Sequence, residues 1–152
     1  MIRQELAAID VLLVEDDPGD VAITREAFEH HKIANKLHVA RDGAEGLDFL
    51  YRRVEFRDAP RPDLILLDLN LPKFDGRHVL KTIKSDPDLQ DIPVVVLTTS
   101  SLQEDVLRSY NLHANAYVTK PVDLDRYMAA IRQIDNFFVQ IYGEKVVMLA
   151  AP

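Results

Sequence analysis

Acidic side chains follow two short apolar runs of the sequence, residues 11–14 and residues 64–67. Glu15 and Asp16 come directly after the first run, and Asp68 comes directly after the second. If both runs are strands of one parallel sheet, their carboxyl ends meet at the edge where such sheets bind ligands. Carboxylates that converge there repel one another unless a cation lies between them. Oxygen ligands in an open site favour Mg²⁺, which keeps some of its water and accepts phosphate as a further ligand.

The alternative interpretation is that these acids only cap helices. Asp17 fits this alternative, because it precedes Pro18 and an acidic cap followed by proline is typical of a helix start. We therefore expect Asp17 to be a helix cap and not a metal ligand. Capping remains the alternative for Asp16, whereas no nearby helix start explains Asp68.

Hydroxyl and amino groups follow two further apolar runs. Thr98 comes directly after residues 94–97, and Lys120 follows Thr119 after residues 116–118. A lysine beside a threonine hydroxyl, a metal ion and a carboxylate would surround phosphoryl oxygens with positive charge and hydrogen-bond donors. Each group alone says little, but four such groups at four strand ends predict a site for a phosphoryl group.

Short apolar runs alternate with helical patterns along the chain. The runs are apolar on both faces, which suits buried strands of a parallel sheet that helices cover on both sides. The expected strands are residues 11–14, 37–40, 64–67, 94–97 and 116–118. The expected helices start after Asp17 and Asp123 or are marked by an apolar stripe, and the stripes are Ala44, Leu47, Leu50 and Tyr51, then Val79, Leu80 and Ile83, then Val106, Leu107 and Tyr110. Five strands that alternate with five helices predict an α/β fold with one doubly wound parallel sheet.

The overall composition excludes several classes of protein. The formal net charge is −7, with 25 acidic and 18 basic residues, so the surface repels nucleic-acid phosphates. The absence of cysteine excludes disulfides and thiolate zinc sites. No apolar run is long enough to span a bilayer, and residues 1–9 contain no signal-peptide core. We therefore expect a cytoplasmic protein with neither a nucleic-acid nor a membrane partner.

Taken together, the motifs resemble the signature of bacterial response-regulator receiver domains, which act in two-component signalling. The intervals also match, with 52 residues from Asp16 to Asp68, 30 from there to Thr98 and 22 more to Lys120. The resemblance covers roughly residues 11–134. The motifs that carry it are Val14-Glu15-Asp16-Asp17, Leu67-Asp68-Leu69-Asn70-Leu71-Pro72, Thr98-Thr99-Ser100 and Tyr117-Val118-Thr119-Lys120-Pro121.

This resemblance implies a flavodoxin-like sheet of strand order 2-1-3-4-5 and a role for each site residue. Asp68 would be the phospho-acceptor, and Thr98 and Lys120 would bind the phosphoryl oxygens. The implied switch is an inward movement of the Thr98 hydroxyl that opens space for Tyr117. The implied ligands of Mg²⁺ are Asp16 and Asp68 directly, Glu15 through water, and the backbone carbonyl of Asn70.

Features outside these motifs resemble the small receivers that are paired with bacterial phytochrome kinases. These features are the long connection over residues 55–63 and the apolar residues that follow the fifth helix. The resemblance implies a phytochrome-type histidine kinase as phosphodonor and a homodimer built through the fourth helix, the fifth strand and the fifth helix. Residues 1–142 would then be the receiver domain with a long fifth helix.

Residues 143–152 form an apolar arm in this division of the chain. So much apolar surface is unusual on a single soluble domain. We expect the arm to contribute to the dimer, and the alternative is that it folds back on its own domain. The expected dimer residues are Tyr127, Ile134, Phe137, Phe138, Ile141, Tyr142, Val146, Val147, Met148 and Leu149.

Two other classes of protein compete with this interpretation. A haloacid-dehalogenase phosphatase also places an aspartate after a strand, but it carries a second acid two residues later, where this chain has Asn70. A pseudo-receiver would be a dimeric binding module that is not regulated by phosphorylation. Because all the chemical groups are present, we expect a switch that catalyses only its own phosphorylation and dephosphorylation.

Overall fold

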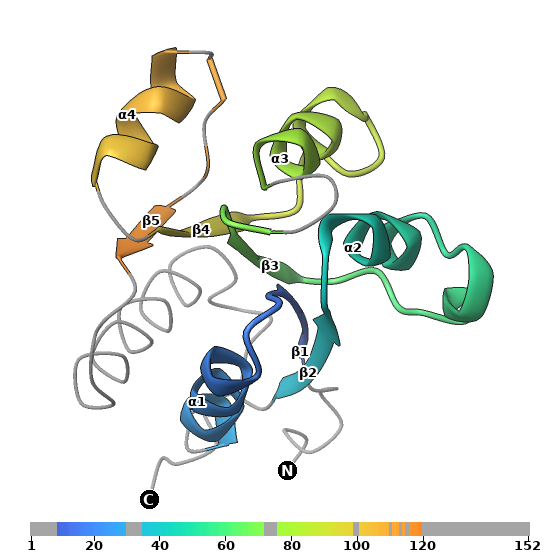
Figure 1. Cartoon of the computed structure of the whole chain (residues 1–152). Coiled ribbons are helices and arrows are strands. Elements are labelled where there is room, and N and C mark those ends of the chain that lie inside the picture. Colours follow the sequence, from blue (N-terminus) through green and yellow to red (C-terminus); the bar gives the residue numbers. More distant parts are fainter. Residues whose placement is uncertain are drawn as a thin grey trace, which may run out of the picture.

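The computed structural model describes residues 9–29, 35–71, 76–98, 101–109, 111–112, 114 and 116–119. Strands and helices alternate through these residues, as Figure 1 shows. The elements are β1 (Ile9–Val14), α1 (Pro18–Glu29), β2 (Asn35–Ala40), α2 (Gly43–Leu50), a 3₁₀ helix (Val54–Phe56), β3 (Leu64–Asp68), α3 (Gly76–Ser85), β4 (Val94–Thr98), α4 (Ser101–Ser109) and β5 (Ala116–Thr119).

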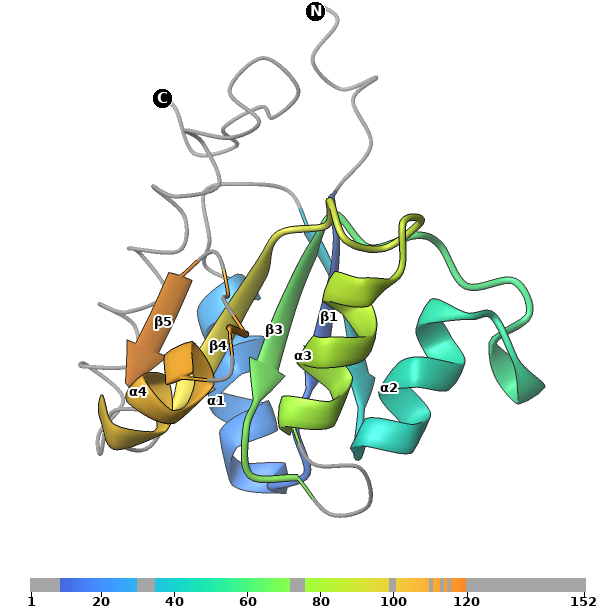
Figure 2. The ribbon, with the colours of Figure 1, turned by 90° about the horizontal axis from the view of Figure 1, so that it is seen from above.

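The strands form one parallel sheet of order β2-β1-β3-β4-β5. The helices α2, α3 and α4 lie on one face of this sheet and α1 lies on the other (Figures 1 and 2). The α/β class, the strand order and all five expected strands are therefore confirmed. The order reverses between β1 and β3, and a doubly wound sheet binds its ligands at such a reversal.

The central strands are buried along their whole length. All five residues of β3 and all five of β4 are buried, which agrees with runs that are apolar on both faces. The edge strand β2 is only half buried, and its sequence pattern is correspondingly weaker. Against this sheet, α3 packs Val79, Leu80 and Ile83, none of which is exposed to solvent. The core therefore fixes the strands whose ends carry the acidic residues.

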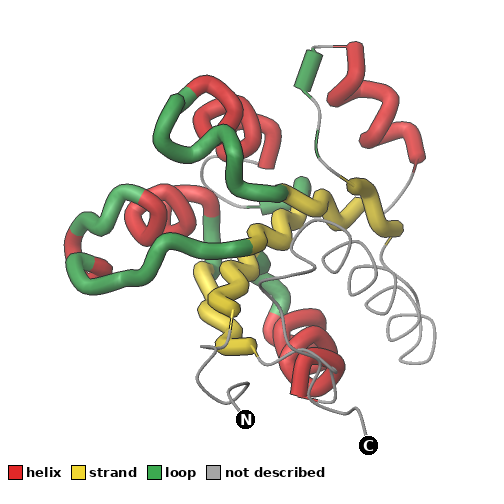
Figure 3. The backbone as a smooth tube through the Cα atoms, turned by 180° about the vertical axis from the view of Figure 1, so that it is seen from behind, coloured by secondary structure: helices red, strands yellow, loops and turns green. Residues whose placement is uncertain are grey.

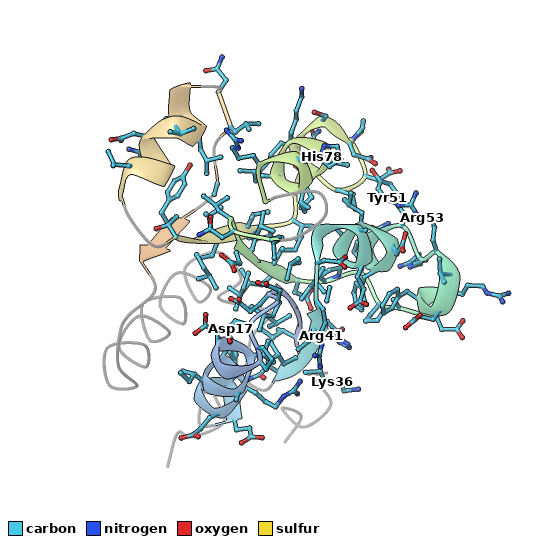
Figure 4. All side chains as sticks on the ribbon, in the orientation of Figure 1. Asp17, Lys36, Arg41, Tyr51, Arg53 and His78 are labelled. Atoms are coloured by element: carbon cyan, nitrogen blue, oxygen red, sulfur yellow. The ribbon has the colours of Figure 1, made fainter. Side chains whose placement is uncertain are left out.

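The view from behind in Figure 3 shows the strands between helices on both sides. The described part of α1 begins at Pro18, and Asp17 Oδ1 accepts a hydrogen bond from the Gly19 N–H at 2.9 Å. Asp17 is therefore a helix cap, as the sequence indicates. Figure 4 shows this side chain at the start of α1.

The apolar stripe of α2 differs from the one that the sequence predicts. Tyr51, expected on the buried stripe, follows the end of the helix and is 37% exposed. Its hydroxyl donates a hydrogen bond to Asp86 Oδ2 at 2.6 Å, and the Arg53 guanidinium lies 5.1 Å from its ring centroid. Tyr51 and Arg53 lie side by side in Figure 4. The buried face of α2 consists of Gly43, Gly46, Leu47, Phe49 and Leu50.

Several expectations concern residues outside the described part of the chain. They are the fifth helix, the apolar arm over residues 143–152 and the position of Lys120. The expected dimer residues from Tyr127 to Leu149 also lie outside it. Among the residues that the structure describes, no helix is long and apolar enough to cross a membrane.

Candidate metal and phosphoryl site at the carboxyl edge of the sheet

Three carboxylates meet at the carboxyl ends of β1 and β3. These strands pair in parallel, with Val14 beside Leu67, so the residues that follow them are neighbours. Oxygen atoms of Glu15, Asp16 and Asp68 all lie within 4.8 Å of one another. The sequence predicted that these three acids would share one edge, and the structure places them together there.

Two of these three carboxylates are buried. Glu15 is 1% exposed and Asp68 is 2% exposed, whereas Asp16 is exposed. Burial and nearby like charges both penalise the ionised form of a carboxylate, and a cation between the groups removes the second penalty. The donor set contains only oxygen atoms and has one open side at Asp16. Such a set fits a hard divalent cation that retains water.

Backbone groups orient both buried carboxylates. Glu15 Oε2 accepts a hydrogen bond from the Asp17 N–H at 3.3 Å, and Asp68 Oδ1 accepts one from the Asn70 N–H at 3.1 Å. Asn70 itself is exposed. Residues 68–70 therefore hold the Asp68 carboxylate through a backbone hydrogen bond and also carry the Asn70 carbonyl, which the resemblance to receiver domains implies as a metal ligand.

Thr98 is the last residue of β4, the strand next to β3, and it is 2% exposed. The register pairs Asp68 with Leu97, so Thr98 follows a direct neighbour of Asp68. The next strand, β5, pairs its Thr119 with Thr98. The chain therefore brings Thr98 to the same edge as the three carboxylates, and Lys120 follows the end of β5 outside the described residues.

Tyr117 lies on β5 and is partly buried against the core. Its hydroxyl accepts a hydrogen bond from the Ala114 N–H at 3.1 Å and donates one to the Leu112 carbonyl at 3.4 Å. The Arg108 guanidinium carbon lies 5.3 Å from the Tyr117 ring centroid. The sequence analysis did not identify Arg108. The feature that could have indicated it is its position as a basic residue in the last turn of α4. The tyrosine is thus held by the connection between α4 and β5.

The comparison with protein families identifies the class of protein. Residues 11–132 match the response regulator receiver domain. The chain therefore belongs to the response regulator receiver family, and its resemblance to that family is confirmed. The fold is accordingly the flavodoxin-like α/β fold of receiver domains.

Individual relatives come from the same family. Response regulator Rcp1 of Synechocystis sp. is 46% identical over 130 residues, which cover 86% of this chain and 88% of Rcp1. A crystal structure of the Mn²⁺-bound form of Rcp1 has a TM-score of 0.79 and 44% identity, and covers 94% of this chain and 99% of that one. The phosphorylated cyanobacterial phytochrome response regulator RcpA has a TM-score of 0.81 and 41% identity, with coverages of 95% and 100%.

Proposed function

We propose that this chain is a phosphorylation switch that accepts a phosphoryl group on Asp68 from a histidine kinase. The observation that carries the proposal is the position of Asp68. Its buried carboxylate lies within 4.8 Å of the carboxylates of Glu15 and Asp16, at an edge that also receives Thr98. A structural aspartate has no need of two acidic neighbours, whereas a phospho-acceptor that requires a divalent cation does.

The transfer follows from the groups at this edge. An oxygen of Asp68 forms a bond to phosphorus while the bond between phosphorus and the imidazole nitrogen of the donor breaks, and the imidazole takes up a proton. The Thr98 hydroxyl and the Lys120 ammonium bind the phosphoryl oxygens, and the Asn70 N–H holds the acceptor carboxylate in place. Positioning and charge stabilisation supply most of the catalysis in such transfers.

Mg²⁺ is the cation that this donor set favours, because every ligand is an oxygen and one side of the site is open. Asp16 and Asp68 would hold it directly, Glu15 through water, and Asn70 through its backbone carbonyl. When bound, Mg²⁺ offsets negative charge on the phosphoryl oxygens. The Mn²⁺-bound structure of Rcp1 shows that a relative with 44% identity takes a divalent cation.

A phytochrome-type histidine kinase is the phosphodonor that the relatives favour, since RcpA is a cyanobacterial phytochrome response regulator. The test is phosphoryl transfer from the purified, autophosphorylated kinase to this chain, followed by loss of label from the kinase. We expect fast transfer to the wild type, no transfer to Asp68→Asn and normal transfer to the matched control Asp63→Asn. Equal transfer to wild type and Asp68→Asn would contradict the acceptor assignment.

Phosphorylation is read out through Thr98 and Tyr117 in this proposal. The Thr98 hydroxyl moves toward the new phosphoryl oxygens, and Tyr117 gives up its hydrogen bonds to Leu112 and Ala114 to fill the vacated space. Tyr117→Phe lacks those hydrogen bonds, so we expect its ring to turn inward without phosphorylation. Aromatic ring resonances of the wild type and the variant, recorded with and without phosphorylation, test this step.

A homodimer through α4, β5, the fifth helix and the apolar arm is part of the proposal. On α4, Leu102 is 70% exposed and Val106 is 41% exposed, which places two apolar side chains one turn apart in solvent. Removal of the chain from Gly143 onward should convert the dimer to a monomer, and Leu102→Glu should weaken it. A truncated chain that remains dimeric in light scattering would exclude the arm from the interface.

The chain is proposed to act through protein contacts and not as an enzyme with an external substrate. Turnover of p-nitrophenyl phosphate separates the two activities, because an aspartyl phosphatase hydrolyses this ester repeatedly. We expect no turnover above that of Asp68→Asn. Cytoplasmic location and the absence of a nucleic-acid partner stay predictions from the sequence.

A further inference from the structure

The first residue of α3, Gly76, packs directly against the backbone of residues 68–70, which we call the acceptor loop because Asp68 is the proposed phospho-acceptor. A methyl group on its Cα would lie 2.5 Å from the Leu69 Cα and 2.6 Å from the Asp68 carbonyl oxygen. Both distances are far below van der Waals contact, and both involve backbone atoms. No described glycine has a positive φ, so the requirement for glycine here comes from this close approach and not from conformational freedom.

Neither side of this contact can move freely. The Gly76 N–H donates a hydrogen bond to the Leu69 carbonyl at 3.1 Å, and the Leu69 N–H donates one to the Leu97 carbonyl of β4 at 3.3 Å. On the other side, α3 is fixed by the fully buried side chains of Val79 and Leu80. A displacement at Gly76 must therefore be absorbed by the peptide that links Asp68 to Leu69.

That peptide belongs to the metal and phosphoryl site. Asp68 Oδ1 accepts the Asn70 N–H, so the direction of the carboxylate depends on the course of the chain from Asp68 to Asn70. The Asn70 carbonyl, a proposed metal ligand, lies on the same short segment. A shift of a few tenths of an ångström at the Leu69 backbone therefore reaches two groups of the site.

We propose that Gly76 is a positioning residue, which sets the direction of the Asp68 carboxylate and the Asn70 carbonyl by allowing α3 to touch the acceptor loop. This inference rests on the proposed function and adds a residue that does not contact metal or phosphoryl oxygens. In this proposal α3 has two roles. Its buried side chains stabilise the fold, and its first residue shapes the site.

The test compares Gly76→Ala with Gly46→Ala in the full chain. A methyl group at Gly46 would lie 3.2 and 3.3 Å from two methyl carbons of Val14, which are side-chain atoms that can move. Both variants add one methyl group to a buried helical glycine, but one contact lies at the site and the other in the core. The measurement is Mg²⁺ affinity by titration calorimetry, with the folded fraction checked by circular dichroism.

We expect Gly76→Ala to bind Mg²⁺ about tenfold more weakly, the loss that changes in the groups orienting metal ligands produce. Gly46→Ala should bind Mg²⁺ within about twofold of the wild type, although both variants lose stability. Equal Mg²⁺ affinity of the two variants at equal folded fraction would overturn the proposal, because Gly76 would then serve packing alone.

A measurement on the wild type covers the case in which Gly76→Ala does not fold. Hydrogen exchange of the Gly76 amide should slow on addition of Mg²⁺, since this amide holds the Leu69 carbonyl of the acceptor loop. The Gly46 amide, which donates to the Asp42 carbonyl at 3.0 Å, is the reference for global stabilisation. Equal slowing at Gly76 and Gly46 would overturn the proposal.

Phosphorylation by acetyl phosphate distinguishes this inference from the proposed function. If the wild type binds Mg²⁺ but gains no phosphoryl group, the proposed function is wrong and the Mg²⁺ affinities still decide the role of Gly76. If the wild type is phosphorylated and both glycine variants bind Mg²⁺ equally well, only the positioning role is wrong. A wild type that binds no Mg²⁺ would overturn both.

Discussion

Acidic residues cluster at both ends of the central sheet, and the two clusters are built in opposite ways. At the amino end, Asp10 lies on β1 and Asp63 precedes β3. At the carboxyl end, Glu15, Asp16 and Asp68 follow or end the same two strands. One cluster of acidic residues therefore joins neighbouring strands, and the other brings three carboxylates together at the opposite edge.

The amino-end cluster satisfies its acids within the chain. Asp63 Oδ2 accepts the Asp10 N–H at 2.9 Å, and the Asp63 N–H donates to the Asp10 carbonyl at 2.7 Å. Asp10 Oδ1 lies 2.9 Å from His38 Nε2 on the neighbouring strand. Each carboxylate thus faces a hydrogen-bonding partner, and the cluster joins β1, β2 and β3.

The carboxyl-end cluster directs its acids toward one another. Three carboxylates share a region in which their oxygen atoms lie within 4.8 Å, and two of them are buried. Like charges this close repel one another, and a cation bound between them would relieve that repulsion. Acidic residues at the two ends of the same strands therefore differ in their neighbours, which are groups of adjacent strands at the amino end and other carboxylates at the carboxyl end.

The largest expected effect is stabilisation by Mg²⁺ through the carboxyl-end cluster. At about a hundredfold excess over its dissociation constant, Mg²⁺ should raise the free energy of unfolding by about 2.7 kcal/mol. Asp16→Ala should lose this stabilisation, because the variant lacks one of the two carboxylates proposed to bind the cation directly. Urea unfolding with Mg²⁺ and with a chelator measures both. Asp63→Ala is the matched control. If this variant also lost the stabilisation by Mg²⁺, the carboxyl-end cluster would not be the specific site of Mg²⁺ binding.

The second largest expected effect is the loss of stability when the amino-end cluster is broken. Asp63→Ala removes the acceptor of the partly buried Asp10 N–H, so the free energy of unfolding should fall by about 2 kcal/mol. The loss should be the same with and without Mg²⁺. Phosphorylation by acetyl phosphate, corrected for the folded fraction, should equal that of the wild type. A stability unchanged from the wild type would show that this cluster does not hold the strands together.

At the carboxyl end, replacing an aspartate should raise the free energy of unfolding, whereas Asp63→Ala at the amino end should lower it. Asp68→Asn removes one of three neighbouring negative charges while its side-chain oxygen can still accept the Asn70 N–H. The free energy of unfolding without metal should therefore rise, because less charge repulsion remains among the three side chains. Urea unfolding in the presence of a chelator checks the direction of this change. A clear decrease would mean that the Asp68 charge is already compensated within the chain.

The smallest effect concerns the pair of Tyr51 and Asp86, away from both clusters. The Tyr51 hydroxyl and then the Asp88 N–H hold the pKa of Asp86 below its ordinary value of 3.8, while the hydrogen bond to Asp86 raises the pKa of Tyr51 above 10.0. The contribution of Asp86 is present above the pKa of the unfolded chain and is lost as the pH falls through the lower folded pKa. That of Tyr51 is present below pH 10.0 and is lost at higher pH.

Tyr51→Phe should therefore flatten the pH dependence of stability at both ends without changing phosphorylation. Thermal unfolding midpoints of the wild type and the variant between about pH 3 and pH 11 measure the difference. Ala22→Ser, at an exposed position of α1, is a control that changes no titratable group. Identical pH profiles for wild type and Tyr51→Phe would exclude a contribution of the pair.

The sequence predicted the parts of the fold and site that depend on local pattern. Apolar runs predict buried strands, and residues that follow parallel strands lie at the same edge of the sheet. Glu15, Asp16 and Asp68 could therefore be placed together. The Asp17 cap is equally local. Thr98 could be placed for the same reason, since it ends β4.

Contacts between distant segments could not be predicted in this way. The partners Asp10 and Asp63 are 53 residues apart, and Tyr51 and Asp86 are 35 residues apart. Tyr51 was expected in the core because it continues a helical period, but the helix ends at Leu50 and the side chain turns outward. The closeness of Gly76 to the acceptor loop depends on how α3 packs on the sheet, which no sequence period encodes.

The assignment of Asp68 as phospho-acceptor can be tested by the intact mass of the full chain after incubation with acetyl phosphate. The wild type with Mg²⁺ should gain one phosphoryl group, and so should the amino-end control Asp63→Asn. The gain should be absent in Asp68→Asn and in the wild type with a chelator. The assignment of the carboxyl-end cluster as the phosphorylation site would be wrong if the wild type stayed unmodified under conditions that phosphorylate another receiver domain. Phosphorylation of Asp68→Asn would contradict the choice of acceptor.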